Sequence, residues 1–160
     1  MIKLIAAATV ALLAVPAPAA ASPADKAAVL ATWTQPTAAA FEEWQAARQN
    51  RDAWTAYGFV WTTDYCTGGP ERPLGFDFRL PCARHDFGYR NYRAAGTLAK
   101  HKRRLDRAFH GDLTRTCRTY RVVLRPVCAT LAWTYFRVVS RTAPPGTAVA
   151  APRSAGSVPR

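Results

Sequence analysis

The sequence predicts a small, all-α helical domain, and three observations support this fold class. Apolar residues recur at helical spacing in several segments, whereas no segment alternates apolar and polar residues long enough to predict a strand. A length of 160 residues suits one domain, and 49% hydrophobic with 20% charged residues is typical of a globular chain. Four cysteines permit two disulfide bridges, too few for the dense framework of a mini-protein.

The two ends of the chain are predicted to lie outside this domain. Residues 1–21 have the features of a signal peptide: an early lysine, an apolar stretch of 11 residues and three alanines at the end. The alternative is a buried first helix. Residues 141–160 are basic and rich in Pro and Ala, which predicts a flexible tail. The expected folded domain is therefore 22–140, and we expect a secreted, extracellular protein in a compartment that allows disulfides.

The first half of the domain is expected to contain three short helices and then a long loop. The helices are predicted at residues 24–33, from Thr37 to about Gln49, and after Asp52. Thr37 and Asp52 are residue types that cap helices. Gly and Pro interrupt the pattern repeatedly over residues 58–81, which predicts a loop. Long loops inside a compact domain are usually functional.

Three longer helices are predicted in the second half. They are expected at residues 81–95, 98–119 and 126–139, and Gly96 can end the first of them. The short connection at Gly96 makes the first two antiparallel neighbours. The apolar pattern of the last helix consists of Val127, Leu131, Thr134, Tyr135 and Val138.

A histidine and an aspartate are predicted to meet between these antiparallel helices. His85 lies 11 residues before Gly96 and Asp106 lies 10 after it, so a rise of about 1.5 Å per residue places them at one height. Asp106 shares a helix face with Phe109 and Leu113, so its carboxylate points inward and needs a partner. A carboxylate that accepts from one imidazole nitrogen frees the other to take a proton, which makes this pair a candidate for catalysis.

The same residues could also have purely structural roles. A single histidine on a helix is usually a packing or surface residue, and Asp106 could instead pair with Arg104, Arg107 or a helix end. Asp64, which precedes the second half, could be a plain turn cap.

The cysteines suggest how a second pair of acids could meet. A bridge between Cys66 and Cys82 would hold Asp64 beside the first turns of the His85 helix, next to Asp86. Two adjacent carboxylates repel each other unless a cation lies between them, and carboxylates with loop carbonyls suit Ca²⁺. Cys117 and Cys128 can close a second loop between the last two helices. No free thiol would then remain, which disfavours cysteine catalysis.

Three sequence blocks resemble the secreted phospholipase A₂ enzymes of the bacterial and fungal branch. They are CARHDFGYRNY at 82–92, WTTDYC at 61–66 and RLDRAF at 104–109. The resemblance implies a Ca²⁺-dependent hydrolase that cleaves the sn-2 ester of glycerophospholipids and releases a fatty acid and a lysophospholipid. The four serines lie at the edges of the chain, which argues against a serine esterase.

The resemblance also implies a role for each residue of the site. His85 would be the general base that activates water, and Asp106 would orient it. Asp64 and Asp86 would bind Ca²⁺ through their carboxylates and Tyr65 through its backbone carbonyl. The cysteines would pair as Cys66–Cys82 and Cys117–Cys128. The implied fold has two antiparallel, disulfide-tied catalytic helices and a calcium-binding loop.

The chain is strongly basic, with a net charge of +12. The densest basic cluster covers residues 100–104 and continues with Arg107; it is expected either to be a solvated face or to attract anionic phospholipid membranes or micelles. No nucleic-acid recognition motif is present, so we expect no nucleic acid partner, and we expect a monomer. The competing hypothesis is a non-catalytic, cationic lipid-binding or antimicrobial secreted protein, which would not need the four acidic and imidazole groups of the predicted site.

Overall fold

A computed structural model describes residues 22–142. The predicted signal peptide, residues 1–21, and nearly all of the predicted tail, from residue 143 on, lie outside the described residues. Within residues 22–142 the chain forms helices and no strand, which confirms the all-α prediction. Two disulfides, Cys66–Cys82 and Cys117–Cys128, are formed as expected, and no cysteine of the described chain is free.

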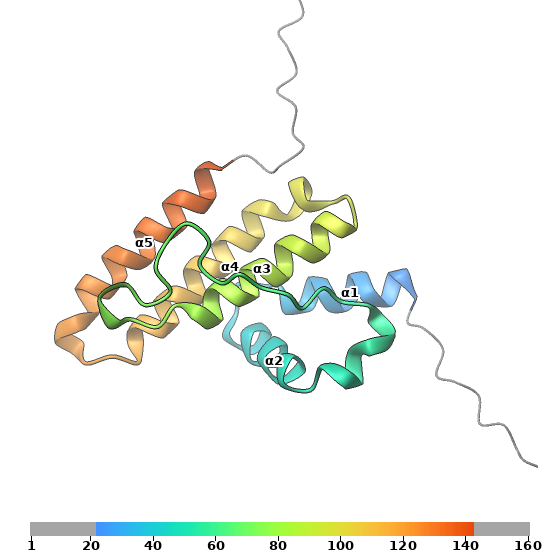
Figure 1. Ribbon diagram of the computed structural model, residues 1–160, viewed down its shortest axis with the longest axis horizontal. Coiled ribbons are helices and arrows are strands. Elements are labelled where there is room, and N and C mark those ends of the chain that lie inside the picture. The colour runs from blue at the N-terminus through green and yellow to red at the C-terminus, as the bar shows by residue number, and fades with distance from the viewer. Residues whose placement is uncertain (1–21, 143–160) are drawn as a thin grey trace, which may run out of the picture.

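The predicted helices are present with small shifts in their ends (Figure 1). The α-helices are α1 (Pro23–Trp33), α2 (Ala38–Gln49), α3 (Arg79–Ala94), α4 (Leu98–Arg118) and α5 (Arg125–Arg141). Three short 3₁₀ helices join them: η1 (Arg51–Tyr57), η2 (Pro73–Gly75) and η3 (Val122–Leu124). The last two were not foreseen, because three-residue turns leave no periodic signal.

Local chemistry explains where α2 begins and where α3 ends. The side chain of Thr37 accepts a hydrogen bond from the backbone of Ala40 at 3.2 Å and caps α2 as predicted. Asp52 caps nothing: η1 follows Asn50, and no side-chain cap bond is present there. Gly96 has φ of 67°, and the Thr97 amide donates to the carbonyl of Tyr92, a left-handed turn that ends α3 and reverses the chain.

The antiparallel pair α3 and α4 forms the middle of the molecule (Figure 1). Helix α5 packs along α4, while α1 and α2 lie toward the other end, and the segment 58–78 crosses the face of the central pair. The two disulfides fasten each central helix to a different neighbour. Cys66–Cys82 ties that crossing segment to α3, and Cys117–Cys128 ties α4 to α5.

Two apolar cores lie on either side of the central pair. One is aromatic and joins α1 and α2 to α3 through Trp33, Trp44, Phe59 and Phe87. The other joins the crossing segment to α4 and α5 through Phe78, Phe109, Leu113, Ala132 and the two disulfides. Because both cores include residues of α3, this helix is held on two sides.

A buried ion pair fixes α3 against α4. Arg84 Nη1 donates to both oxygens of Asp112 at 2.9 and 2.8 Å, and both side chains are almost fully buried. The same guanidinium donates to the carbonyls of Trp33 at 3.0 Å and Gln35 at 2.7 Å. Arg84, the residue before His85, therefore joins α3 to α4, to the end of α1 and to the loop that follows α1.

Candidate active site

His85 on α3 and Asp106 on α4 lie side by side. His85 Nε2 is 3.1 Å from Asp106 Oδ1, and the two side chains are 11% and 5% exposed. The helices approach closely here because Gly88 has no side chain; a Cβ at Gly88 would lie 2.5 Å from Leu105 Cδ2. The Gly96 turn and this close approach together produce the equal height that the spacing predicts.

Asp106 accepts two further hydrogen bonds. Tyr89 donates from its hydroxyl to Oδ1 at 2.6 Å, and Lys102 Nζ donates to Oδ2 at 2.6 Å. Burial alone would raise the pKa of Asp106, but the hydrogen bonds from His85, Lys102 and Tyr89 hold this pKa below its usual value. Burial and the contact with Asp106 raise the pKa of Tyr89, so its hydroxyl stays protonated and donates. The carboxylate is therefore ionised and fixed in orientation.

A charged carboxylate at this position dictates the state of the imidazole. Since Asp106 only accepts, His85 Nε2 carries the proton and Nδ1 is left as the proton acceptor. The His85 ring lies between the rings of Tyr89 and Phe109, with centroid distances of 4.2 and 4.7 Å. The arrangement can therefore take a proton from a water and stabilise the resulting imidazolium.

Asp86, the neighbour of His85, faces the crossing segment. Its Oδ2 accepts from the Thr63 hydroxyl at 2.7 Å and from the backbone amide of Asp64 at 3.1 Å. Burial raises the pKa of Asp86 to about 6, and the nearby Asp64 carboxylate also raises it. The Cys66–Cys82 bridge thus brings Asp64 to Asp86, as the sequence predicts.

Asp64 is held by a cation of the protein itself. Arg90, one turn after Asp86 on α3, donates from Nη2 to Asp64 Oδ1 at 2.6 Å, and the Asp64 side chain is 56% exposed. Residues 22–142 contain no cluster of three or more His, Cys, Asp or Glu side chains placed to hold a metal. A set of two carboxylates and backbone carbonyls does not require such a cluster. Its oxygen donors are of the type that Ca²⁺ prefers.

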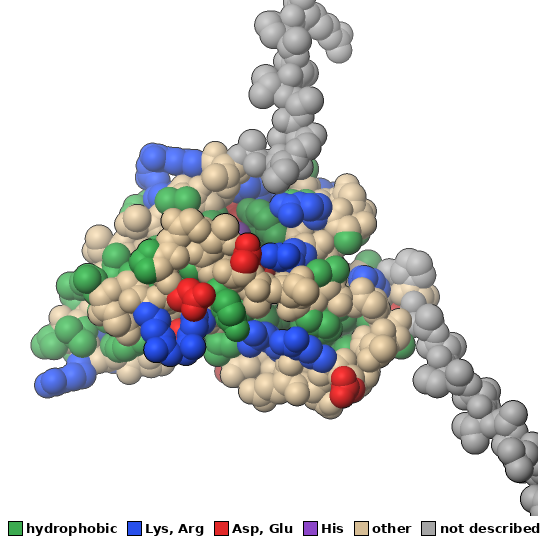
Figure 2. Space-filling view, viewed as in Figure 1, with side chains coloured by type: hydrophobic (Ala, Val, Ile, Leu, Met, Phe, Trp, Pro, Cys, Tyr) green, Lys and Arg blue, Asp and Glu red, His purple; other side chains and the backbone are tan. Residues whose placement is uncertain are grey.

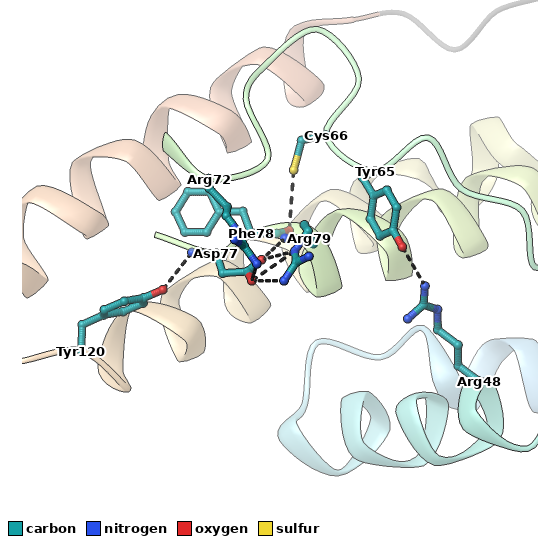
Figure 3. Close-up of polar contacts among 8 residues, drawn as sticks. All are labelled: Arg48, Tyr65, Cys66, Arg72, Asp77, Phe78, Arg79 and Tyr120. Carbon is teal, nitrogen blue, oxygen red and sulfur yellow. Dashed lines mark hydrogen bonds and ion pairs between the residues drawn. The ribbon is translucent and has the colours of Figure 1, made fainter. Parts of the chain in front are cut away.

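Tyr65 adopts a backbone conformation that bulky residues rarely use. Its φ is 56°, in the left-handed region, and its carbonyl accepts from the amide of Thr67 at 3.0 Å. Its hydroxyl accepts from Arg48 Nη2 on α2 at 3.5 Å, as Figure 3 shows. This uncommon conformation fixes the direction of the Tyr65 carbonyl, which is the group predicted to bind Ca²⁺.

The far end of the same segment is fastened by polar contacts (Figure 3). Asp77 pairs with Arg72 and with Arg79, the first residue of α3, and the Asp77 amide donates to the Tyr120 hydroxyl at 2.8 Å. The Cys66 sulfur lies 3.6 Å from the Phe78 carbonyl. The part of the crossing segment from Tyr65 to Phe78 is therefore anchored at both of its ends.

His85 and Asp86 line a cavity of about 400 Å³. Its walls are the loop residues 65–70, Phe109 of α4, and Val138 and Val139 of α5. The mostly apolar lining with polar groups at one place is typical of a site for an amphiphilic ligand.

Two members of the expected basic cluster, Lys102 and Arg104, are bonded inside the protein. Within the cluster at 100–104, Lys102 is buried and also donates to the Val139 carbonyl at 2.7 Å, and Arg104 donates to the Tyr92 hydroxyl and to Thr34. Only Lys100 and Arg103 of that run, together with Arg107, are exposed. Part of the predicted basic cluster is therefore exposed to solvent, and its attraction to anionic lipid stays a prediction.

Three residues of this site were not singled out from the sequence. Tyr89 lies four residues after His85, Lys102 four residues before Asp106, and Arg90 four residues after Asp86. Such i, i+4 neighbours share a helix face, so this spacing could have identified all three.

Comparison with known proteins shows the family to which the chain is similar. The family described as prokaryotic phospholipase A2 matches residues 36–143, more than half of the chain. A secretory phospholipase A2 of Beauveria bassiana (strain ARSEF 2860) is 45% identical over 58 residues, which is 36% of this chain and 30% of that protein. A secretory phospholipase A2 of Arthroderma benhamiae (strain ATCC MYA-4681 / CBS 112371) is 36% identical over 58 residues, 36% of this chain and 39% of that protein. The matched region is thus well under half the length of either relative.

Proposed function

Because this chain belongs to the prokaryotic phospholipase A2 family, we propose that it hydrolyses the sn-2 ester of glycerophospholipids with Ca²⁺ as its cofactor. The products are a free fatty acid and a lysophospholipid. We further propose that the protein is secreted, which the names of its two relatives support. The substrate is an aggregated lipid, in a membrane or a micelle, rather than a nucleic acid.

The observation that carries this proposal is the hydrogen-bond network around Asp106. Lys102 and Tyr89 donate to Asp106, and Asp106 contacts His85, which lines an apolar cavity. A protein that only binds lipid would not need a buried carboxylate with three donors, since burying such a group is costly unless it is fully paired. The arrangement favours the enzyme over the non-catalytic, cationic lipid-binding protein.

In this mechanism His85 is the general base. Nδ1 of His85 takes a proton from a water molecule, which then attacks the ester carbonyl. Asp106 stabilises the imidazolium that forms and keeps the ring in the productive orientation. Tyr89 and Lys102 hold Asp106, so neither needs to touch the substrate. The leaving glycerol oxygen receives the proton back from His85.

The other residues bind and orient. Asp64, Asp86 and the carbonyl of Tyr65 would hold Ca²⁺, and the contact between Arg90 and Asp64 Oδ1 would have to open for the ion to reach that oxygen. When bound, the ion supplies positive charge for the ester oxygen as it becomes negative and for the substrate phosphate. Phe109, Val138 and Val139 contact the acyl chain and exclude water from it.

The experiment is fatty-acid release from sn-2-labelled phospholipid vesicles, with Ca²⁺ and with excess chelator. We expect release only with Ca²⁺, and loss of at least about a hundredfold in His85→Gln, the range that a general base contributes. An equally folded His110→Gln protein is the matched control, because His110 lies at Trp133 and Phe136 away from the cavity. Release that ignores the chelator would remove Ca²⁺ from the proposal. No release from folded, oxidised protein would favour the lipid-binding alternative.

A further inference from the structure

Large apolar side chains gather at the end of the molecule where α4 turns into α5. Leu74 of η2, Val122, Val123 and Leu124 of η3, and Val127 of α5 are each 42 to 77% exposed. Figure 2 shows hydrophobic side chains along this end of the surface, with a basic side chain beside them. We call these five residues the apolar tip. Contiguous exposed apolar groups of this kind mark binding surfaces.

The two parts of the tip are held together. Phe76, two residues after Leu74, packs edge-on against Tyr120 with ring centroids 4.9 Å apart, and Tyr120 precedes η3 by two residues. Figure 1 accordingly shows η2 beside the turn from α4 to α5. Leu74 has φ of 51° although it is an exposed leucine, an uncommon conformation that presents an apolar side chain to solvent.

The rim of the tip is positively charged on the side of α4 and α5. On the side of Leu74, the acid Asp77 is paired with Arg72 and Arg79. Arg118, Arg121 and Arg125 are exposed, and none forms an ion pair with a residue of the described chain. From Leu113 to the end of the sequence there is no Asp or Glu. An apolar patch with an unbalanced cationic rim complements an anionic lipid surface, since apolar groups enter the acyl region while arginines contact headgroups.

Helix α5 continues this surface toward the cavity. In the described chain, the segment Val122–Arg141 is long and apolar enough by length and composition to cross a membrane, yet only 11% of it is buried. It cannot cross one while it remains part of this fold, because Cys128 is bonded to Cys117 and α5 packs along α4. Val127, Leu131, Thr134 and Val138 follow one helix face, from the tip to the cavity wall.

We propose that the apolar tip and this face of α5 dock on the surface of an anionic phospholipid bilayer, an inference that rests on the proposed function for the identity of the partner. The docked helix lies in the plane of the interface, with its Val138 end at the mouth of the cavity. Lipid then reaches His85 along an apolar path. The docking surface does not include the basic run at 100–104, which lies at the start of α4, whereas the tip lies beyond the end of that helix.

The test measures binding separately from hydrolysis. Full-length protein is mixed with vesicles of ether-linked phosphatidylcholine, with and without ether-linked phosphatidylglycerol, which have no sn-2 ester to cleave, and bound protein is quantified by sedimentation. We expect stronger binding with phosphatidylglycerol. Val123→Asp and Leu74→Asp should each weaken that binding at least about tenfold, because each removes apolar area from the interface and adds a repelled charge.

The matched control is Ala99→Asp, which adds the same charge at an exposed site by the α3–α4 turn, beside the basic run. It should bind like the unmodified protein. Hydrolysis of a short-chain phospholipid below its micelle concentration should be unchanged in Val123→Asp and Leu74→Asp, because neither residue lines the cavity.

Three results would overturn the docking surface. They are unchanged binding in both tip variants, a loss in Ala99→Asp equal to theirs, or conversion of a dimer to a monomer by Val123→Asp with vesicle binding intact. The last would make the tip a contact between two copies of the chain. If the protein hydrolyses no phospholipid at all, the proposed function fails, but the vesicle comparison still decides whether the tip binds anionic bilayers.

Discussion

Arg90 Nη2 lies 2.6 Å from Asp64 Oδ1, so a guanidinium of α3 neutralises one of the two carboxylates proposed to bind Ca²⁺. In the proposed function, Arg90 would compete with Ca²⁺ for Asp64, from the same helix as His85 and Asp86.

Arg90→Gln should bind Ca²⁺ about two- to fivefold more tightly, because a half-exposed ion pair contributes roughly 0.5–1 kcal/mol that the metal no longer has to replace. Isothermal titration with Ca²⁺ measures this directly, without reference to activity. Arg93→Gln removes the same charge from an exposed position one turn later and serves as the control. Equal or weaker affinity in Arg90→Gln than in that control would contradict the competition.

Lys102→Met should lower kcat and leave KM nearly unchanged. Lys102 holds Asp106 Oδ2 and the carbonyl of Val139, so its loss frees the buried carboxylate to turn away from His85 without altering the cavity. The free energy of unfolding should also fall by about 1.5–3 kcal/mol, the range for hydrogen bonds to charged groups. Steady-state kinetics on folded protein and denaturant titration measure the two effects. Lys102→Arg should recover part of kcat; a variant with full kcat at reduced stability would limit Lys102 to a structural role.

The two disulfides should differ in their effect on Ca²⁺ binding. They close loops with sequence separations of 16 and 11 residues, so each removal should cost roughly 3 kcal/mol of stability. Only Cys66–Cys82 holds the loop of Asp64 against Asp86. The Cys66→Ala/Cys82→Ala protein should lose Ca²⁺ affinity, while Cys117→Ala/Cys128→Ala should retain it under conditions where both are folded. Equal affinities would show that the loop needs no covalent anchor.

Asp77→Asn should reduce stability near neutral pH but not in acid. The hydrogen bond from Arg79 lowers the pKa of Asp77 to about 2, below the value of about 3.9 in an unfolded chain, so its contribution is present above about pH 4 and is lost as the pH falls toward 2. The side chain is 36% exposed, which limits this contribution to roughly 0.5–1 kcal/mol.

Urea unfolding at a series of pH values checks this dependence on the Asp77 charge. Asp52→Asn is the control, because the Asp52 side chain makes no hydrogen bond or ion pair within residues 22–142. A difference between the Asp77 variant and the unmodified protein that persists unchanged to pH 2 would show that something other than charge is lost.

The pairing of His85 with Asp106 could be predicted because it depends only on helix rise and on a reversal at Gly96. The meeting of Asp64 and Asp86 needed only the positions of Cys66 and Cys82. The two members of each pair are 21 and 22 residues apart, yet regular backbone geometry or one covalent bond is enough to bring them together. Their roles in catalysis and in Ca²⁺ binding remain predictions for the experiments above.

The sequence by itself determined the all-α class, the limits of the main helices to within a few residues, and the residues that could meet between α3 and α4. Only the tertiary structure decided which charged side chains are buried and which apolar side chains are exposed. Arg84 and Lys102 look like surface cations in the sequence but are buried. Arg84 pairs with Asp112 of the facing helix, and Lys102 pairs with Asp106 of its own helix and donates to the Val139 carbonyl of α5. Val127 and Val138 belong to an apolar helical pattern yet are exposed, since nothing in the described chain covers that side of α5. Periodicity reflects the geometry of a few neighbouring residues, whereas burial depends on which distant elements pack together.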